Sequence, residues 1–250
     1  MKSLDTLLAD SFGFFRDNFL RFCTIILLLY LPLRLLHIFL ESVGYLPDAN
    51  LVYALIAHKS KGSLLYILVS IVVMSASTLA GLLFMVWTNV FIAANVRGQR
   101  LSPLEVLKLS GERLWPFVEL LITLTAKLLL WSVCFILPGI YFAVLYAQAA
   151  PAFFVDGKRG VAALAASREV ISKDWKRFVL FSLVICVLTS LLFKLGDVVF
   201  ANIFGVNEEG ELRVLPTIGK VLFDLYLLHL MTFTATFNIF FYREMKGDRL

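Results

Sequence analysis

The feature that most constrains this sequence is the recurrence of long apolar runs along its whole length. A helix needs about 20 apolar residues to cross the roughly 30 Å hydrocarbon layer of a bilayer, and several runs approach or reach that length. Of the 250 residues, 60% are hydrophobic and only 16% are charged. A soluble domain of this size has no core large enough to bury several such helices. The sequence therefore predicts an all-α, polytopic membrane helix bundle that forms a single integral membrane domain over residues 1–250.

The apolar runs predict about six transmembrane helices. We place them at Phe22–Leu40, Leu64–Ala94, Trp115–Ile136, Pro138–Val155, Phe178–Ile203 and Pro216–Tyr242. Pro138 and Gly139 separate the third span from the fourth, since proline is tolerated in the first turn of a helix and glycine permits a tight bend. These two residues therefore predict a hairpin of spans three and four.

The connections between the spans predict the orientation of the chain. Sixteen Lys and Arg residues fall in the N-terminal segment, the 96–113 and 156–177 connections and the C-terminal tail, whereas three fall in the opposite connections. Because positively charged connections stay in the cytoplasm, both termini are predicted to be cytoplasmic. Basic and aromatic side chains are expected to anchor the protein at the interface. They are Arg16, Arg21, Arg100, Arg113, Trp115, Trp175 and Arg177.

The chain also contains a candidate threefold repeat of an amphipathic cytoplasmic helix followed by a transmembrane hairpin, over residues 1–95, 96–156 and 157–250. Ser11 corresponds to Ser167 at a constant offset, and the middle copy aligns Ser110 with them only after a three-residue deletion. Such amphipathic helices are typical of the headgroup region. The alternative is that loops leading into membrane helices share this pattern without a duplication.

Several short motifs occur in order along nearly the whole chain. They are Phe14-Phe15-Arg16 with Phe19, Gly98-Gln99-Arg100 with Ser102, Pro138-Gly139-Ile140, Ala150-Pro151 and Ser167. Their order and spacing resemble the YciC-like family of bacterial inner-membrane proteins and, more distantly, the membrane domain of some glycerophosphodiester phosphodiesterases. The resemblance implies a six-helix fold in the bacterial inner membrane and no known reaction, and the chain has no phosphodiesterase domain.

Ionisable residues inside the apolar spans are candidates for a binding site, because they are costly in lipid and usually face a bundle interior or water. In the outer half of the bilayer they predict a cavity for an anionic group such as a lipid headgroup. The candidate residues are Arg34, His37, Lys127, Lys194, Lys220 and Asp224. The alternative is that Lys194 and Lys220 extend to the outer interface, with Asp224 neutralising Lys220 four residues away. The turn at Gly98 is either a phosphate-contacting turn or a helix stop followed by interface anchors.

Sequence patterns of known catalytic sites are absent. There is no Gly-rich phosphate loop, no His-Glu-x-x-His and no Gly-x-Ser-x-Gly, and the three histidines lack the spacing of metal ligands. We therefore expect no catalytic residue, no metal and no cofactor. The basic residues are dispersed over four segments, which does not favour nucleic acid as a partner.

The function favoured by the sequence is that of a non-enzymatic inner-membrane protein with membrane lipids as its partners. It binds or transports a lipid-like or amphipathic anionic solute, or supports envelope homeostasis. One alternative is a structural or scaffolding subunit of a membrane complex, with protein partners that the sequence does not identify. Another is a membrane-embedded enzyme, for which Lys220 and Asp224 are the obvious acid–base pair.

Overall fold

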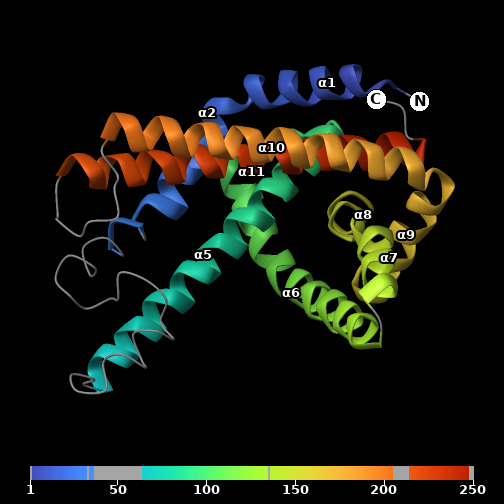
Figure 1. Ribbon diagram of the computed structural model, residues 1–250, viewed down its shortest axis with the longest axis horizontal. Helices are drawn as coiled ribbons and strands as arrows, with labels where there is room; N and C mark the ends of the chain where they lie inside the picture. The colour runs from blue at the N-terminus through green and yellow to red at the C-terminus, as the bar shows by residue number, and fades with distance from the viewer. Residues whose placement is uncertain (1, 33, 37–63, 135, 205–213, 248–250) are drawn as a thin grey trace. The chain divides into compact units, whose positions relative to one another are not determined.

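The computed structural model describes residues 2–32, 34–36, 64–134, 136–204 and 214–247, and these residues form helices and no strand (Figure 1). Five helical segments are long and apolar enough to cross a membrane: Ile71–Val96, Pro103–Val133, Pro138–Asp156, Trp175–Ile203 and Val221–Lys246. The predicted first span lies partly outside the described residues, which contain a shorter apolar helix at Phe19–Leu28. The predicted all-α, multi-pass fold is confirmed.

The helices belong to two compact units. In chain order they are α1 (Leu4–Asp17), α2 (Phe19–Ile25), the π-helix η1 (Ile26–Tyr30), α5 (Leu64–Val96), α6 (Pro103–Cys134), α7 (Ile136–Tyr146), α8 (Ala149–Asp156), α9 (Gly160–Lys173), α10 (Trp175–Phe204) and α11 (Val214–Lys246). Unit 1 contains Met1–Leu20, Met85–Leu192 and His229–Leu250, and unit 2 contains Arg21–Phe84 and Phe193–Leu228. Helices α2, α5, α10 and α11 contribute residues to both units.

In unit 1, α6 packs against α7 and α9, and α8 packs against α9 (Figure 1). Trp131 of α6 stacks on Phe142 of α7 with ring centroids 4.3 Å apart, and Phe117 of α6 contacts Phe154 of α8 at 5.0 Å. The contact nearer the start of α6, at Phe117, is thus made with the later helix α8, and the contact nearer the end of α6, at Trp131, is made with the earlier helix α7. This register makes α6 antiparallel to the segment formed by α7 and α8.

The connection between α6 and α7 lies close to the predicted start of the fourth span at Pro138. Helix α6 ends at Cys134 and α7 begins at Ile136, two residues before the predicted start, so Pro138 and Gly139 lie in the first turn of α7. A proline is tolerated there because the first N–H groups of a helix have no intrahelical partner. Gly139 serves helix packing: a Cβ atom at this position would lie 3.1 Å from the Cα atom of Ser132 in α6.

Replacing Gly139 with alanine is expected to destabilise the protein by about 1–3 kcal/mol, because the added methyl group pushes α7 away from the backbone of α6. The matched control is Gly111→Ala in α6, where no described atom lies within 4 Å of the new Cβ. This control is expected to be neutral or to stabilise the helix by up to about 1 kcal/mol. Thermal unfolding of both variants in detergent tests the difference, and equal stabilities would show that α6 and α7 do not depend on this close approach.

The fourth predicted span is interrupted between α7 and α8. Gln148 lies at the break with 1% of its surface exposed, and its Oε1 atom has no hydrogen-bond partner in the described structure. Ser167 of α9 bridges the break: its Oγ accepts the backbone N–H of Gln148 at 3.0 Å and donates to the carbonyl oxygen of Leu145 at 2.7 Å. The break has a cause in the sequence, because Pro151 has no N–H for the carbonyl of Ala147 and its ring would crowd that carbonyl in a continuous helix.

The predicted amphipathic helices differ from the expectation in two ways. The segment that was expected to precede the third span as a separate helix is continuous with it in α6, which has 32 residues. Helix α1 turns part of its apolar face toward the protein, since Phe14 contacts Phe91 of α5 and Phe240 of α11 at 6.4 and 5.7 Å. The three serines aligned in the candidate repeat, Ser11, Ser110 and Ser167, are all fully buried. The repeat itself stays a prediction.

Candidate functional site

Basic side chains gather at the C-terminal end of α8 in unit 1. Arg97, which follows α5, reaches the carbonyl oxygen of Val155 with its Nη1 atom at 3.5 Å, and Arg113 of α6 donates to the carbonyl oxygen of Phe154 at 3.1 Å. Both Arg97 and Arg159 lie close enough to Arg113 to repel it electrostatically. We call Arg97, Arg113 and Arg159 the arginine cluster.

The local sequence explains why arginines are stable at this place. The last carbonyl groups of a helix have no intrahelical partner and form the negative end of the helix dipole, which favours a positive charge. Gly157 follows α8 with a φ of 69°, a left-handed conformation that ends the helix and that glycine adopts without strain. The chain then passes through Arg159 into α9.

Positive charge exceeds negative charge around the cluster. The carboxylate of Glu112 attracts Arg113. Asp156, at the end of α8, already accepts a hydrogen bond from the Tyr242 hydroxyl at 2.7 Å and forms an ion pair with Lys246 at 2.9 Å. Asp156 is therefore neutralised by its own partner from α11.

The arginine cluster also keeps hydrogen-bond donors for a ligand. A guanidinium group has five N–H donors. Within the described residues, Arg113 uses one donor and Arg97 uses two, on the carbonyl oxygens of Ala93 and Val155, whereas Arg159 makes no side-chain hydrogen bond. Arg97 and Arg159 are exposed and Arg113 is half-buried. The cluster is thus accessible to an anion.

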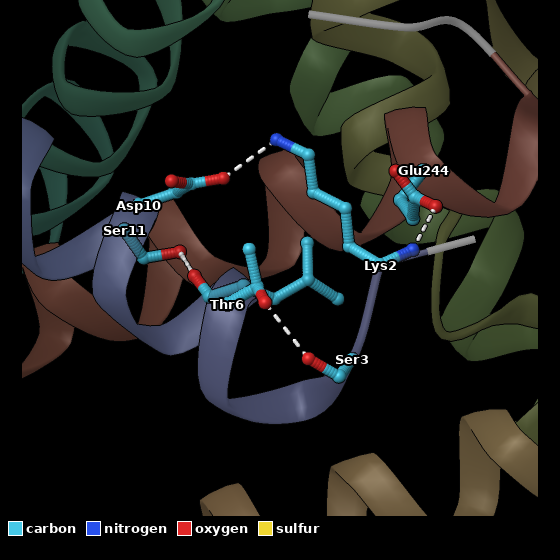
Figure 2. A network of polar contacts seen from close by, with 7 residues as sticks. Lys2, Ser3, Thr6, Asp10, Ser11 and Glu244 are labelled. Atoms are coloured by element: carbon cyan, nitrogen blue, oxygen red, sulfur yellow. Dashed lines mark hydrogen bonds and ion pairs between the residues drawn. The ribbon is translucent and has the colours of Figure 1, made fainter.

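A second polar network joins the two ends of the described chain (Figure 2). Lys2 forms an ion pair with Asp10 through its Nζ atom at 2.6 Å. The backbone N–H of Lys2 donates to the Glu244 carboxylate at 2.5 Å. The carbonyl oxygen of Lys2 accepts a hydrogen bond from Arg177 of α10. These contacts bring the start of α1 to the end of α11 within unit 1, whereas the side of the membrane that they face stays a prediction.

Of the six residues predicted to bind an anion, the described structure brings Arg34 and Asp224 together. In unit 2, the Nε atom of Arg34 donates to Oδ2 of Asp224 at 2.6 Å, with the two side chains 20% and 22% exposed. The observed partner of Asp224 is thus Arg34, and the side chain of Lys220 lies outside the described part of α11. Lys194 is exposed on α10 in the same unit. His37 lies outside the described residues.

Lys127 belongs to unit 1, and its environment differs from that of Arg34. The Nζ atom of Lys127 lies 5.8 Å from the centroid of the Tyr146 ring, a distance at which a cation is attracted to an aromatic face. Tyr146 is the last residue of α7, directly before the break in the fourth span. Lys127 is therefore held near the interrupted part of the apolar segment.

Most of the predicted interface anchors lie on the surface of the helices that carry them. Trp115 and Trp175 are 73% and 54% exposed, and Arg16, Arg21 and Arg100 are also exposed. Arg177 is half-buried, with its guanidinium 5.0 Å from the centroid of the Phe181 ring. Arg113 differs from the other anchors because it belongs to the arginine cluster.

Arg159 and Gln148 were not among the site residues predicted from the sequence. One signal in the sequence indicated that Arg97 could contact a ligand, its position directly before Gly98. In the structure α5 ends at Val96 and Gly98 has a φ of 76°, so the helix stops there. Arg159 had a comparable signal in the Gly157-Lys158-Arg159-Gly160 connection, since two glycines flank two basic residues.

No family model matches the chain, and neither a curated protein nor a solved structure matches it. The resemblance to the YciC-like family therefore stays a prediction. Across the described residues, no group of three or more His, Cys, Asp or Glu side chains is arranged to hold a metal ion.

Proposed function

We propose that this multi-pass membrane protein binds the headgroup of an anionic lipid, or a lipid-like anionic solute, at the arginine cluster and catalyses no reaction. The observation that supports the proposal is the gathering of Arg97, Arg113 and Arg159 at the end of α8, with donors that the described protein groups do not use. Guanidinium groups form paired, charge-assisted hydrogen bonds with phosphate and carboxylate oxygens. We further propose a bacterial inner-membrane location with both termini in the cytoplasm.

The position of the cluster along α6 favours a ligand from the membrane. Helix α6 has 32 residues and is about 48 Å long, whereas the hydrocarbon layer is roughly 30 Å thick. Arg113 lies about 15 Å along the helix from Pro103, so the part of α6 beyond Arg113 is long enough to cross the hydrocarbon. Trp115 follows two residues later with its ring exposed, and tryptophan is enriched at the membrane–water interface. These features support a position for Arg113 at the depth of the lipid headgroups.

Replacing Arg113 with glutamine is expected to lower the retention of anionic lipid by about tenfold or more, because a hydrogen bond to a charged group contributes about 1.5–3 kcal/mol. The measurement is native mass spectrometry of the protein purified in mild detergent, with anionic and zwitterionic lipids counted separately. The matched control is Arg168→Gln, which removes an exposed arginine of α9 outside the cluster. Equal anionic lipid on the wild type and both variants would refute a binding role for the cluster.

A structural or scaffolding role is the second candidate, and the contacts that join helix ends in unit 1 favour it. Arg243 of α11 donates to the carbonyl oxygen of Val96 at 2.6 Å. Asp156 of α8 accepts a hydrogen bond from Tyr242 and forms an ion pair with Lys246, both of α11. On this alternative a defined protein partner co-purifies with the wild type, and the bound lipid is the same in wild type and Arg113→Gln. An enzymatic role has less support, because Asp224 of the suggested acid–base pair is engaged by Arg34.

A further inference from the structure

We propose that the arginine cluster selects a phosphomonoester headgroup over a phosphodiester headgroup. This inference rests on the proposed function and specifies the chemistry of the ligand at the same site. A phosphomonoester carries a charge of about −1.5 to −2 at neutral pH, whereas a phosphodiester carries a single negative charge.

The positive charges at the site are fixed. Each of the three arginines contributes one guanidinium group, a side chain that carries its positive charge permanently in proteins. A fourth guanidinium, that of Arg243, lies beside Arg97, because it donates to the carbonyl oxygen of the preceding residue, Val96. The site therefore holds four permanent positive charges.

The negative charges near the site are fewer. Glu112 attracts Arg113, and a carboxylate oxygen of Glu119 lies 4.0 Å from the Cβ position of Gly160, the residue after Arg159. Asp156 is neutralised by Lys246. Lys158 directly precedes Arg159 and adds a further positive charge. After the pair of Asp156 and Lys246 is set aside, the positive groups outnumber the carboxylates by three. A dianionic headgroup compensates more of this excess than a monoanionic headgroup does.

The hydrogen-bonding capacity of the cluster points to the same ligand. A phosphomonoester presents three terminal oxygens that accept strong hydrogen bonds. The guanidiniums of Arg97 and Arg113 reach the end of α8 from different parts of unit 1, and Arg159, which follows α8 in the chain, acts electrostatically on Arg113. Each of the three keeps N–H donors that no described protein group occupies. A phosphodiester has one terminal oxygen fewer and so engages fewer of these donors.

Selectivity for a phosphomonoester is expected to depend on pH, because the phosphate group itself gains a proton within the working range. The second pKa of a phosphomonoester is about 6, so the headgroup loses one negative charge as the pH falls below that value. The other charged or titratable groups of the site belong to α6, α8, the α8–α9 connection and α11. They are Glu112, Glu119, Asp156, Lys158, Tyr242 and Lys246.

The test uses the full-length protein in nanodiscs of phosphatidylcholine that contain equal mole fractions of phosphatidic acid or phosphatidylglycerol. Native mass spectrometry counts the bound lipid at pH 7.5 and at pH 5.5. We expect at least about tenfold more phosphatidic acid than phosphatidylglycerol at pH 7.5, and a smaller ratio at pH 5.5. Arg113→Gln and Arg159→Gln are expected to lose the preference, and Arg168→Gln is expected to keep it. Glycerol 3-phosphate added in solution shows by competition whether a soluble phosphomonoester also occupies the site.

The outcomes separate this inference from the proposed function. Equal retention of phosphatidic acid and phosphatidylglycerol, both above phosphatidylcholine, would overturn the selectivity and leave anionic lipid binding in place. Retention of neither lipid above phosphatidylcholine would overturn both. If Arg113→Gln fails to fold, the test stands on the wild-type pH dependence and on Arg159→Gln, whose side chain makes no hydrogen bond to the described residues.

Discussion

Replacing Arg34 with leucine is expected to lower the free energy of unfolding by about 3–5 kcal/mol, because it leaves the Asp224 carboxylate partly buried without a partner. The two groups are joined at 2.6 Å, and about four fifths of each side chain is shielded from solvent. Water therefore screens the pair weakly, unlike an ion pair at the protein surface. The measurement is reversible unfolding in mixed detergent micelles.

A double-mutant cycle distinguishes the cost of an unpaired charge from the loss of a contact. The Asp224→Leu variant is expected to be destabilised to a similar extent, because it leaves Arg34 unpaired. Combining Arg34→Leu with Asp224→Leu is expected to restore most of the lost stability, since two apolar side chains then face each other. Lys194→Leu, on the exposed surface of α10 in the same unit, is expected to change stability by at most about 0.5 kcal/mol. Additive losses in the double variant would argue against an energetically coupled pair.

Replacing Ser167 with alanine is expected to destabilise the protein by about 2–5 kcal/mol, because one hydroxyl satisfies two backbone groups at the break between α7 and α8. Without it, the carbonyl of Leu145 and the N–H of Gln148 lose their partner in a buried part of an apolar segment. Each unsatisfied buried group costs about 1–3 kcal/mol. Chemical unfolding measures the loss, and hydrogen exchange at Gln148 reports whether the break itself opens.

Ser110→Ala is the matched control for this substitution. Ser110 is as fully buried as Ser167, but its hydroxyl donates to the carbonyl of Val106 within its own helix α6. The carbonyl of Val106 lies inside the continuous helix α6 and does not depend on the hydroxyl, so the expected loss of unfolding free energy is about 1 kcal/mol or less. If the two variants lost the same stability, burial of the hydroxyl rather than the bridge across the break would be the cause.

The membrane fold is predictable from the sequence because it depends on the length and composition of apolar runs. The run from Trp175 to Ile203 is an example, since no soluble fold of this size accommodates a helix so apolar. The interruption of the fourth span was not predicted, because hydropathy does not register backbone hydrogen bonds. Pro151 was present as a signal, but the role of Ser167 in closing the break depends on the packing of α9.

The candidate site was predicted less well than the fold, and for a related reason. Periodicity identifies neighbours on one helix, such as Lys220 and Asp224, whereas Arg34 meets Asp224 across 190 residues of sequence. Arg113 was predicted as an interface anchor, but its proximity to Arg97 and Arg159 depends on where α5 and α8 end in space. Tertiary contacts of this kind have no counterpart in the spacing of residues along a single chain.

The continuity of α6 ties the arginine cluster to the thickness of the bilayer. A helix about 48 Å long adapts to a thinner or thicker membrane by changing its tilt, and every residue on it changes depth together. Arg113 lies about 15 Å from the start of α6, while Trp131 stacks on α7 near the other end of the helix. Lipids with longer or shorter acyl chains are therefore expected to raise or lower the cluster relative to the headgroups, so that the same headgroup binds with different strength in membranes of different thickness.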